Sequence, residues 1–527
     1  MNPSKQFRPR PAQAILEAAA SRAPGLDCLD FFGRVYTYGD IGDLVNRAAR
    51  GFQDLGIGKG ERIGLCLPNT PYYVIAYFAA LKAGATVVNF NPLYTAAEIA
   101  GQIAASGVRV MVTIDEKSLY PKIVAAFAGI SKPIVVVCPL ADVLPMVKGW
   151  MYGVFRSTRT VPASGIRGVS YGELIANAAA PDPVDIEPVE DIAVLQYTGG
   201  TTGEPKGVML SHANVAANTE QVRRWLGGTA DGEERILSVL PFFHAFAMTS
   251  AMNLGIATAS KLILLPRFDP ADTIKTIEAS RPTLFPVVPT IINAINNYPG
   301  IEKRDLGSLR YCISGGAPLP VEVKARFEKL AGCVVLEGYG LSEASPVVAC
   351  NPREGENKPG SVGLPLPWTE VEFRDPDNPG QKAKSGERGE IVVRGPQVMK
   401  GYWNDEEATK AALSGGWLRT GDIGHRDKDG YIYLTDRLKD VIFCSGFKVY
   451  PRIIEDVLHR HPDVEEVVVA GVPDDYRGEA PKAFIKLRRG AKTTEDEILT
   501  FAASNLNPIE RPTAVEFRDE LPKTFIG

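Results

Sequence analysis

Apolar and polar positions alternate between two patterns over the first 115 residues. Continuous apolar runs are typical of strands buried on both faces of a sheet, whereas longer segments with helical spacing are typical of helices packed on it. The first pattern predicts strands, and the second predicts helices between them. The predicted strands are Arg62–Leu67, Ala85–Phe90 and Val108–Thr113, and the predicted helices are Pro71–Ala83 and Thr95–Ala105. Such alternation predicts a parallel sheet with helices against its faces.

The rest of the chain contains three further patterns of predicted secondary structure. Ile134–Cys138 and Lys261–Leu265 repeat the pattern of a buried strand. Between Pro352 and Asp436, short β-type runs among Gly and Pro turns indicate a small barrel or a distorted sheet. These runs are Val371–Arg374, Glu390–Arg394 and Tyr431–Leu434. A compact mixed segment follows Lys439, with helices predicted at Arg452–His459 and Thr494–Asn505 and strands at Val464–Val472 and Lys482–Leu487.

Composition limits the class of protein. The 527 residues exceed one ordinary core, so about two to four domains are expected. A net charge of −4 argues against a nucleic-acid-binding face. The seven cysteines contain no Cys-x-x-Cys pair, which suits reduced thiols. The start lacks a hydrophobic signal core and no apolar stretch is long enough to span a bilayer, so we expect a cytoplasmic protein.

A glycine- and threonine-rich run is the first candidate site. Residues 197–207 read Tyr-Thr-Gly-Gly-Thr-Thr-Gly-Glu-Pro-Lys-Gly, directly after the apolar segment 191–196. Glycines let backbone N–H groups approach an anion, while threonine hydroxyls and Lys206 add donors and a positive charge. The spacing does not fit the P-loop pattern. A phosphate-binding loop of another kind is predicted, and an ordinary surface turn is the alternative.

Four further runs accompany this loop in order. They are Tyr339-Gly-Leu-Ser-Glu343, Gly416-Trp-Leu-Arg-Thr-Gly-Asp422, Asp436-Arg-Leu-Lys-Asp440 and Ser445-Gly-Phe-Lys-Val-Tyr-Pro451. Together the five runs closely resemble the adenylate-forming acyl-activating enzymes, a superfamily of acyl-CoA synthetases, firefly luciferase and nonribosomal peptide adenylation domains. The resemblance implies an α/β fold: a large N-terminal domain of helix-flanked sheets with a small distorted β-barrel (1–437), and a small mobile α+β C-terminal domain (438–527).

The resemblance also implies a site for ATP and Mg²⁺. Thr198 and Glu343 match the positions of magnesium ligands, and oxygen ligands beside substrate phosphates suit this ion. The loop and Lys206 would hold the departing phosphates, Tyr339 would lie against adenine, and Asp422 and Arg437 would reach the ribose or the α-phosphate. The full set implied for the nucleotide is Thr198, Gly199, Gly200, Thr201, Thr202, Gly203, Lys206, Gly316, Ala317, Glu337, Gly338, Tyr339, Ser342, Asp422, Arg437 and Lys439.

The acyl group is expected beside His244, which matches the histidine that lies near the substrate carboxylate in this superfamily. A satisfied core histidine is the alternative. The residues expected around the acyl group are small, flexible or aromatic and carry no charge that could pair with an amino group. They are Phe246, Met248, Ala251, Met252, Gly255 and Gly315. The general resemblance to bacterial ligases implies medium- or long-chain fatty acids, with 4-coumarate and other aryl acids as the alternative.

Attack by CoA on the adenylate would use the C-terminal segment. Lys439 matches the hinge position, and Ser445, Gly446, Phe447 and Lys448 match the segment that contacts CoA. Relatives commonly carry a neutral amide at the position of Lys448. The superfamily's final signature ends in a lysine that acts in adenylation, and Leu521-Pro-Lys-Thr-Phe-Ile-Gly527 stops one residue before it. We therefore expect that the chain is truncated at this end. Lys206, His244, Glu343 and Arg437 are the predicted catalytic residues.

Two further interpretations concern a membrane contact and a role without catalysis. Residues 144–159 mix Met, Trp, Tyr and Phe with Lys148, Arg156 and Arg159, which indicates an interfacial segment at a membrane surface. An apolar loop packed on the protein's own core is the competing interpretation. The second alternative is a binding module for acyl-adenylate or acyl-CoA without turnover, which the presence of Lys206 and Glu343 disfavours.

Overall fold

The computed structural model describes residues 7–155, 165–198, 205–227, 230–376, 378, 380–384, 386–445, 447–474 and 477–522. Of the residues predicted above, Gly199–Gly203, Gly446, residues 156–159 and the chain end from Lys523 lie outside this described part. All seven cysteines lie within it and are buried without disulfide bonds.

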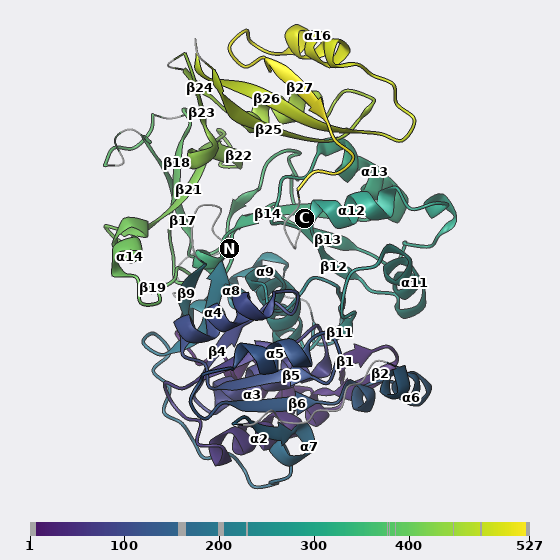
Figure 1. The fold of residues 1–527 in the computed structure, drawn as a ribbon, viewed down its shortest axis with the longest axis vertical. Helices are drawn as coiled ribbons and strands as arrows, with labels where there is room; N and C mark the ends of the chain where they lie inside the picture. Colours follow the sequence, from purple (N-terminus) through teal and green to yellow (C-terminus); the bar gives the residue numbers. More distant parts are fainter. Residues whose placement is uncertain are drawn as a thin grey trace.

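An eight-stranded sheet forms one end of the molecule (Figure 1). The strands from β8 to β7 are parallel, and β9 and β19 are added antiparallel at one edge. In spatial order the strands are β19 (Gly401–Tyr402), β9 (Lys206–Ser211), β8 (Ile192–Thr198), β4 (Thr86–Asn89), β3 (Arg62–Cys66), β5 (Val110–Ile114), β6 (Ile134–Cys138) and β7 (Arg167–Ser170).

A nine-stranded sheet follows, again with a parallel centre and antiparallel edges. In spatial order its strands are β16 (Leu364–Pro365), β15 (Val347–Cys350), β14 (Val334–Gly340), β13 (Tyr311–Ser314), β12 (Leu284–Val287), β10 (Arg235–Ser238), β11 (Lys261–Leu264), β1 (Asp27–Phe31) and β2 (Arg34–Thr37). The carboxyl ends of β10, β13 and β14 lead directly into three of the predicted motifs, at His244, Gly315 and Glu343.

Helices pack against both sheets, and the two helices predicted at Pro71–Ala83 and Thr95–Ala105 are α3 and α4. The helix α4 begins with a capping box between Thr95 and Glu98 and ends at Gly107, whose φ of 69° suits a glycine. These helices are α1 (Ala14–Arg22), α2 (Tyr38–Asp54), α3 (Pro71–Lys82), α4 (Ala96–Ser106), α5 (Tyr120–Ala126), α6 (Met146–Phe155), α7 (Tyr171–Leu174), α8 (His212–Trp225), α9 (Ala245–Ala247), α10 (Leu254–Ala257), α11 (Pro270–Ser280), α12 (Pro289–Asn296), α13 (Val321–Ala331) and α14 (Glu406–Ala412).

The segment with short β-runs is a five-stranded antiparallel sheet, in the order β17–β18–β21–β20 with β22 also paired to β21. It is the distorted sheet predicted between Pro352 and Asp436. Its strands are β17 (Glu370–Arg374), β18 (Gly389–Arg394), β20 (Leu413–Ser414), β21 (Trp417–Arg426) and β22 (Ile432–Arg437).

The last segment has a sheet and a core of its own. Its buried cluster begins at Ile442, whereas the large cluster ends at Ile432. The elements are β23 (Ile442–Cys444), β24 (Phe447–Val449), α15 (Pro451–Leu458), β25 (Val464–Asp474), β26 (Gly478–Leu487), α16 (Glu495–Asn505) and β27 (Ala514–Phe517). The predicted α/β fold class, with a large N-terminal and a small C-terminal domain, is confirmed. The boundary at 437/438 stays a prediction.

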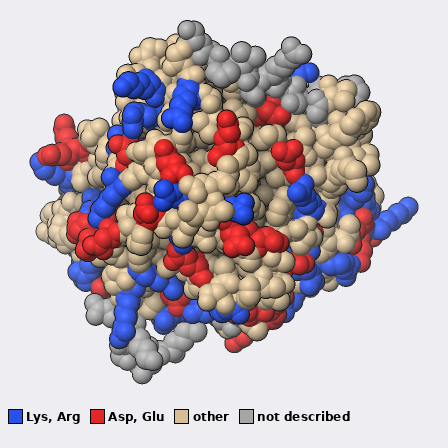
Figure 2. All heavy atoms as spheres, turned by 90° about the horizontal axis from the view of Figure 1, so that it is seen from below, with Lys and Arg blue, Asp and Glu red and all other residues tan. Residues whose placement is uncertain are grey.

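No helix in the described part of the chain is long and apolar enough to cross a membrane. The face seen from below carries Lys and Arg side chains interspersed with Asp and Glu (Figure 2).

Candidate active site

The glycine- and threonine-rich run joins two neighbouring antiparallel strands, β8 and β9. Thr198 ends β8 and pairs with Lys206, the first residue of β9, so both stand at the base of the intervening loop. The ammonium of Lys206 lies 3.6 Å from Oδ2 of Asp405 and 5.3 Å from the ring centroid of Tyr402. It is half-exposed. The structure therefore fixes the lysine and the base of the loop, while the five glycine and threonine positions between them lie outside the described residues.

Glu343 contacts the hydroxyl of Tyr402. The Tyr402 hydroxyl donates a hydrogen bond of 2.9 Å to Oε1 of Glu343. Glu343 belongs to a short 3₁₀ segment, Ser342–Ala344, after β14, and its carbonyl accepts from the Met399 backbone. Because β19 carries Tyr402 and pairs with β9, three distant segments converge here. Burial, followed by the charge of Glu343, raises the pKa of Tyr402.

Tyr402 and Asp405 also belong to this site, although the sequence did not predict them as site residues. The only available signal was the aromatic pair Tyr402-Trp403 between two β-type segments. Their place in the site depends on the pairing of a two-residue strand with β9, which no local pattern indicates.

Tyr339, Asp422 and Arg437 form a second cluster, as the resemblance implies. The Tyr339 hydroxyl donates a 2.6 Å hydrogen bond to Oδ2 of Asp422, and Nε of Arg437 lies 3.5 Å from Oδ1. Asp422 and Arg437 are paired residues of β21 and β22. Burial raises the pKa of Asp422, against the hydrogen bond from Tyr339 and the charge of Arg437. A nearly buried carboxylate is thus held between a phenol and a guanidinium.

The ends of β13 and β14 form a wall beside these clusters. Ser314 and Glu337 are paired across the two strands. A Cβ atom on Gly315 would lie 3.3 Å from Cζ of Phe246 and 3.6 Å from the carbonyl of Gly338, so a larger residue would require a small shift of the Phe246 ring. The following Gly316 has a φ of 82°.

Several buried polar atoms in this region lack a hydrogen-bond partner among the described residues. They are the Tyr197 hydroxyl, Nε2 of His244, the Ser314 hydroxyl and Oε1 of Glu337. Burial raises the pKa of Glu337 to about 7, although Lys324, 3.8 Å away, opposes the shift. Because buried polar groups normally find partners, these four atoms are available to a polar ligand.

His244 precedes the helical segment that contains the predicted acyl-pocket residues. Its ring lies 4.7 Å from that of Phe243, and burial lowers its pKa to about 4, so the imidazole is neutral near pH 7. The segment Met248–Asn253 is a π-helix, a form that recurs at functional sites. No sequence signal indicated this distortion.

The predicted acyl-pocket residues divide into two groups. Phe246 is half-buried against Gly315, whereas Met248, Ala251 and Met252 are fully buried in the large core. A Cβ atom on Gly255 would meet Leu262 at 2.4 Å, so this glycine faces the nine-stranded sheet.

The described part of the chain holds no group of three His, Cys, Asp or Glu side chains suited to a metal. Glu343 has one carboxylate oxygen bonded to Tyr402, and its other oxygen has no hydrogen-bond donor among the described residues. Mg²⁺ usually keeps waters and substrate phosphates among its ligands, so the two oxygens predicted from Thr198 and Glu343 would be enough protein ligands for it.

The residues predicted to contact CoA lie elsewhere. Cys444 and Phe447 pair at the end of the β23–β24 hairpin, and Ser445 stands at its tip with a φ of 52°. The Ser445 N–H donates to the carbonyl of Arg477 within the small domain. Figure 1 places this hairpin far from α9, so the structure does not bring it together with His244. Lys439 lies in the exposed 3₁₀ segment Leu438–Asp440 between β22 and β23.

Comparisons with known proteins agree with this architecture. The AMP-binding enzyme family matches residues 16–403, and the AMP-binding enzyme C-terminal domain matches residues 453–527. The chain is 44% identical to the long-chain-fatty-acid–CoA ligase of Bacillus subtilis, over 98% of this chain and 92% of that protein. It is 34% identical to 4-coumarate–CoA ligase 3 of Oryza sativa, over 94% of this chain and 86% of the relative.

Among solved structures, ATP-bound MatB from Rhodopseudomonas palustris superimposes with a TM-score of 0.86 at 28% identity, covering 98% of this chain and 97% of that one. A large helix-flanked α/β domain with a nucleotide site and a small α/β domain define the AMP-binding class of enzymes. The chain belongs to the AMP-binding enzyme family. The resemblance stated from the five motifs is confirmed.

Proposed function

We propose that the protein is an ATP-dependent fatty acid–CoA ligase. It forms an acyl-adenylate with release of pyrophosphate and then an acyl-CoA thioester with release of AMP. The observation that carries this proposal is the 44% identity with a long-chain-fatty-acid–CoA ligase across nearly the whole chain. The protein is thus an acid–thiol ligase that uses ATP and CoA as co-substrates.

Charge neutralisation and positioning dominate the first step, because phosphoryl chemistry of this kind needs little covalent help from the protein. We assign Lys206 and the loop 198–203 to the β- and γ-phosphates, and Thr198 and Glu343 to Mg²⁺, which would neutralise phosphate charge. The contact of Lys206 with Asp405 supports a positioned ammonium at the base of the loop.

The nucleoside is assigned to the second cluster. Asp422 and Arg437 would bind the ribose, with Tyr339 and Gly338 against the adenine. The carboxylate of Asp422 already accepts from Tyr339 at 2.6 Å, which fixes its orientation before a ligand arrives. Glu337, Ser342, Gly316, Ala317 and Lys439 complete the nucleotide set as predictions.

His244 is assigned to the substrate carboxylate. A neutral imidazole with its Nε2 buried and unpartnered among the described residues can donate or accept one hydrogen bond there, without adding a charge. Its role is orientation of the acid, with the acyl chain extending towards Phe246, Met248, Ala251, Met252 and Gly315.

The second step is assigned to the small domain. Rotation about Lys439 would bring Ser445, Gly446, Phe447 and Lys448 to the adenylate. The distance of this hairpin from α9 supports a conformational step between the two half-reactions. In the present arrangement Asp436 accepts from the Arg452 backbone at 2.9 Å, a contact across the proposed hinge.

A substrate panel tests the proposed function. We expect oleate and palmitate to give acyl-CoA, with AMP and pyrophosphate formed in equal amounts, and 4-coumarate to react at least about tenfold more slowly at equal concentration, a difference of about 1.4 kcal/mol. The measurement is thioester formation by chromatography, with octanoate, benzoate and acetate for comparison. Formation of ADP would contradict the mechanism. Preference for 4-coumarate would favour the aryl-acid alternative, which the 34% identity with a 4-coumarate–CoA ligase supports.

A membrane contact through α6 is the finer part of the proposal. The helix is fixed on its inner side, where Gly149 approaches the carbonyl of Ala141 and the Tyr152 hydroxyl donates to Asp115. Its outer side presents large apolar side chains, with Trp150 69% exposed and Met146 89% exposed. The five exposed apolar residues share one helix face, and they are Met146, Val147, Trp150, Met151 and Val154. Such a face suits the boundary of a lipid surface.

The variant Met146→Ser/Trp150→Ser tests this contact. We expect several-fold less co-sedimentation with vesicles that contain anionic lipid, because two outward apolar side chains are lost, and unchanged activity on the soluble substrate octanoate. The matched control is Val468→Ser/Phe517→Ser, which changes exposed apolar residues of the small domain. Equal co-sedimentation of wild type and the α6 variant would show that the face has another use.

A further inference from the structure

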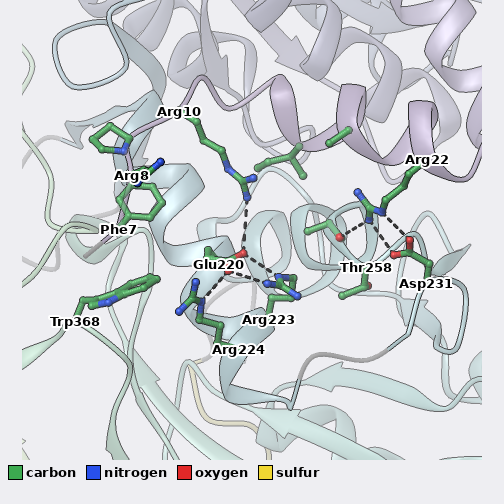
Figure 3. A pocket seen from close by; sticks show the side chains of 14 residues that line it. Phe7, Arg8, Arg10, Arg22, Glu220, Arg223, Arg224, Asp231, Thr258 and Trp368 are labelled. Atoms are coloured by element: carbon green, nitrogen blue, oxygen red, sulfur yellow. Dashed lines mark hydrogen bonds and ion pairs between the residues drawn. The ribbon is translucent and has the colours of Figure 1, made fainter. Parts of the chain in front are cut away.

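A cavity of about 1140 Å³ lies outside the site described above. It is open to solvent on one side and is lined by the N-terminal segment Phe7–Arg10, the helix α1, the end of α8 and the loop that carries Trp368 (Figure 3). Asp231 lines it from the segment before β10, whereas His244 follows that strand, so the cavity and the candidate active site lie at opposite ends of β10.

Charge is the first unusual property of this cavity. Five arginines line it against two carboxylates, an excess of three positive charges. The protein as a whole carries a net charge of −4, so the composition of the chain does not account for this concentration. A cavity with this balance attracts anions.

Three of the five arginines already form hydrogen-bonded ion pairs with the two carboxylates. Glu220 accepts 2.8 Å hydrogen bonds from Arg223 and Arg224. Asp231 forms a two-point pair with Arg22, at 2.7 and 3.0 Å, and Arg22 also donates to the carbonyl of Ala257. Figure 3 shows these two clusters side by side on the wall of the cavity. They hold Arg22, Arg223 and Arg224 in place.

Arg8 and Arg10 are not satisfied in this way. Nε of Arg10 is buried without a hydrogen-bond partner among the described residues, and its Nη2 lies 3.8 Å from Glu220, beyond hydrogen-bond distance. The exposed Arg8 makes no hydrogen bond or ion pair with any described residue. The Arg10 side chain is otherwise 40% exposed, so apart from this buried N–H the donors of Arg8 and Arg10 are open to solvent and can bind an anion.

An apolar aromatic wall stands beside these arginines. The rings of Phe7 and Trp368 lie 5.8 Å apart, and the guanidinium of Arg224 lies 4.7 Å from the Trp368 ring. Solvent-accessible guanidinium groups suit phosphate oxygens, which they bind through two parallel hydrogen bonds. The aromatic wall suits an organic group attached to the phosphate. The volume exceeds the usual range of about 300–1,000 Å³ for ligand pockets, so size admits such a molecule.

We propose that this cavity binds a phosphorylated organic anion of nucleotide or CoA size, held by Arg8 and Arg10. Free nucleotides and CoA share this chemistry. The site is separate from the catalytic nucleotide site, and the proposal does not depend on the reaction assigned to the protein.

Binding measurements on the full chain test the proposal. The probes are ATP, CoA and inorganic tripolyphosphate, titrated by calorimetry at low ionic strength, where contacts between charges are least screened. The test variant is Arg8→Glu/Arg10→Glu. The matched control is Arg47→Glu/Lys275→Glu, which makes the same charge change at exposed positions elsewhere. Melting temperatures of both variants check folding, and Arg8→Gln/Arg10→Gln replaces the test variant if its melting temperature falls.

We expect wild type and the control to bind one more equivalent of ATP or CoA than the test variant does. Affinity for the favoured organic anion at this additional site should exceed that for tripolyphosphate by about tenfold. Acyl-CoA formation, measured separately, should be unchanged by the test variant. Identical stoichiometry and affinity in wild type and the test variant would overturn the proposal. Equal affinity for tripolyphosphate would overturn the assignment to an organic ligand.

Discussion

Glu343→Ala should lower the rate of ATP–pyrophosphate exchange by about 30- to 1,000-fold, because the loss of one electrostatic contact in a transition state costs about 2–4 kcal/mol. Glu343 is held by Tyr402 through one oxygen at 2.9 Å and leaves its second oxygen for the proposed Mg²⁺. Lys206→Ala should have a smaller effect, about 1–3 kcal/mol, because the loop offers further donors to the same phosphates.

Two companion variants separate a metal role from a structural one. Tyr402→Phe removes only the hydroxyl that orients Glu343, and it should cost about 1 kcal/mol or less. Glu343→Gln keeps the size of the side chain and should shift the Mg²⁺ concentration needed for half-maximal exchange upwards. A wild-type exchange rate in Glu343→Ala, or an unchanged Mg²⁺ requirement in Glu343→Gln, would contradict the assignment.

The parallel part of the fold was predictable because its strands are buried on both faces. Ile134–Cys138 matches β6 at both ends, and the helix predicted at Pro71–Ala83 is α3, which ends at Lys82. In such a fold, long apolar runs have few alternatives to a central strand. The helix predicted at Thr95–Ala105 is α4, and its two ends carry residues that favour helix termini, Thr95 at the start and Gly107 after the last turn.

Contacts made between distant segments were not predictable in the same way. Tyr402 reaches Glu343 only because the two-residue strand β19 pairs with β9, and so short a strand has no periodicity. The π-helix at Met248–Asn253 lies in a continuously buried stretch, where an apolar pattern fits any helical winding. The arginine-lined cavity draws on segments that lie far apart in the chain, such as Arg10 and Trp368.

The nucleotide cluster shows what a family pattern can add. Tyr339 and Asp422 are 83 residues apart, and neither the spacing nor the composition places them in contact. The motifs implied that both serve one ligand, and the structure shows that they also bond to each other. A residue assigned to substrate therefore has a second, structural task, which variants of this pair can separate.

Asp422→Ala should raise the KM for ATP by about tenfold to 150-fold, since a hydrogen bond to a charged group contributes about 1.5–3 kcal/mol. The carboxylate is the proposed ribose acceptor, and a contact made equally in ground and transition states acts on KM with little change in kcat. Tyr339→Phe is the matched control: it keeps the ring against the adenine and removes only the 2.6 Å bond to Asp422. Its KM for ATP should change less than that of Asp422→Ala, because Arg437 still faces the carboxylate at 3.5 Å. Should the two variants raise KM equally, and the double variant no further, Asp422 would serve only to hold Tyr339, and the ribose would have to be bound by Arg437 alone.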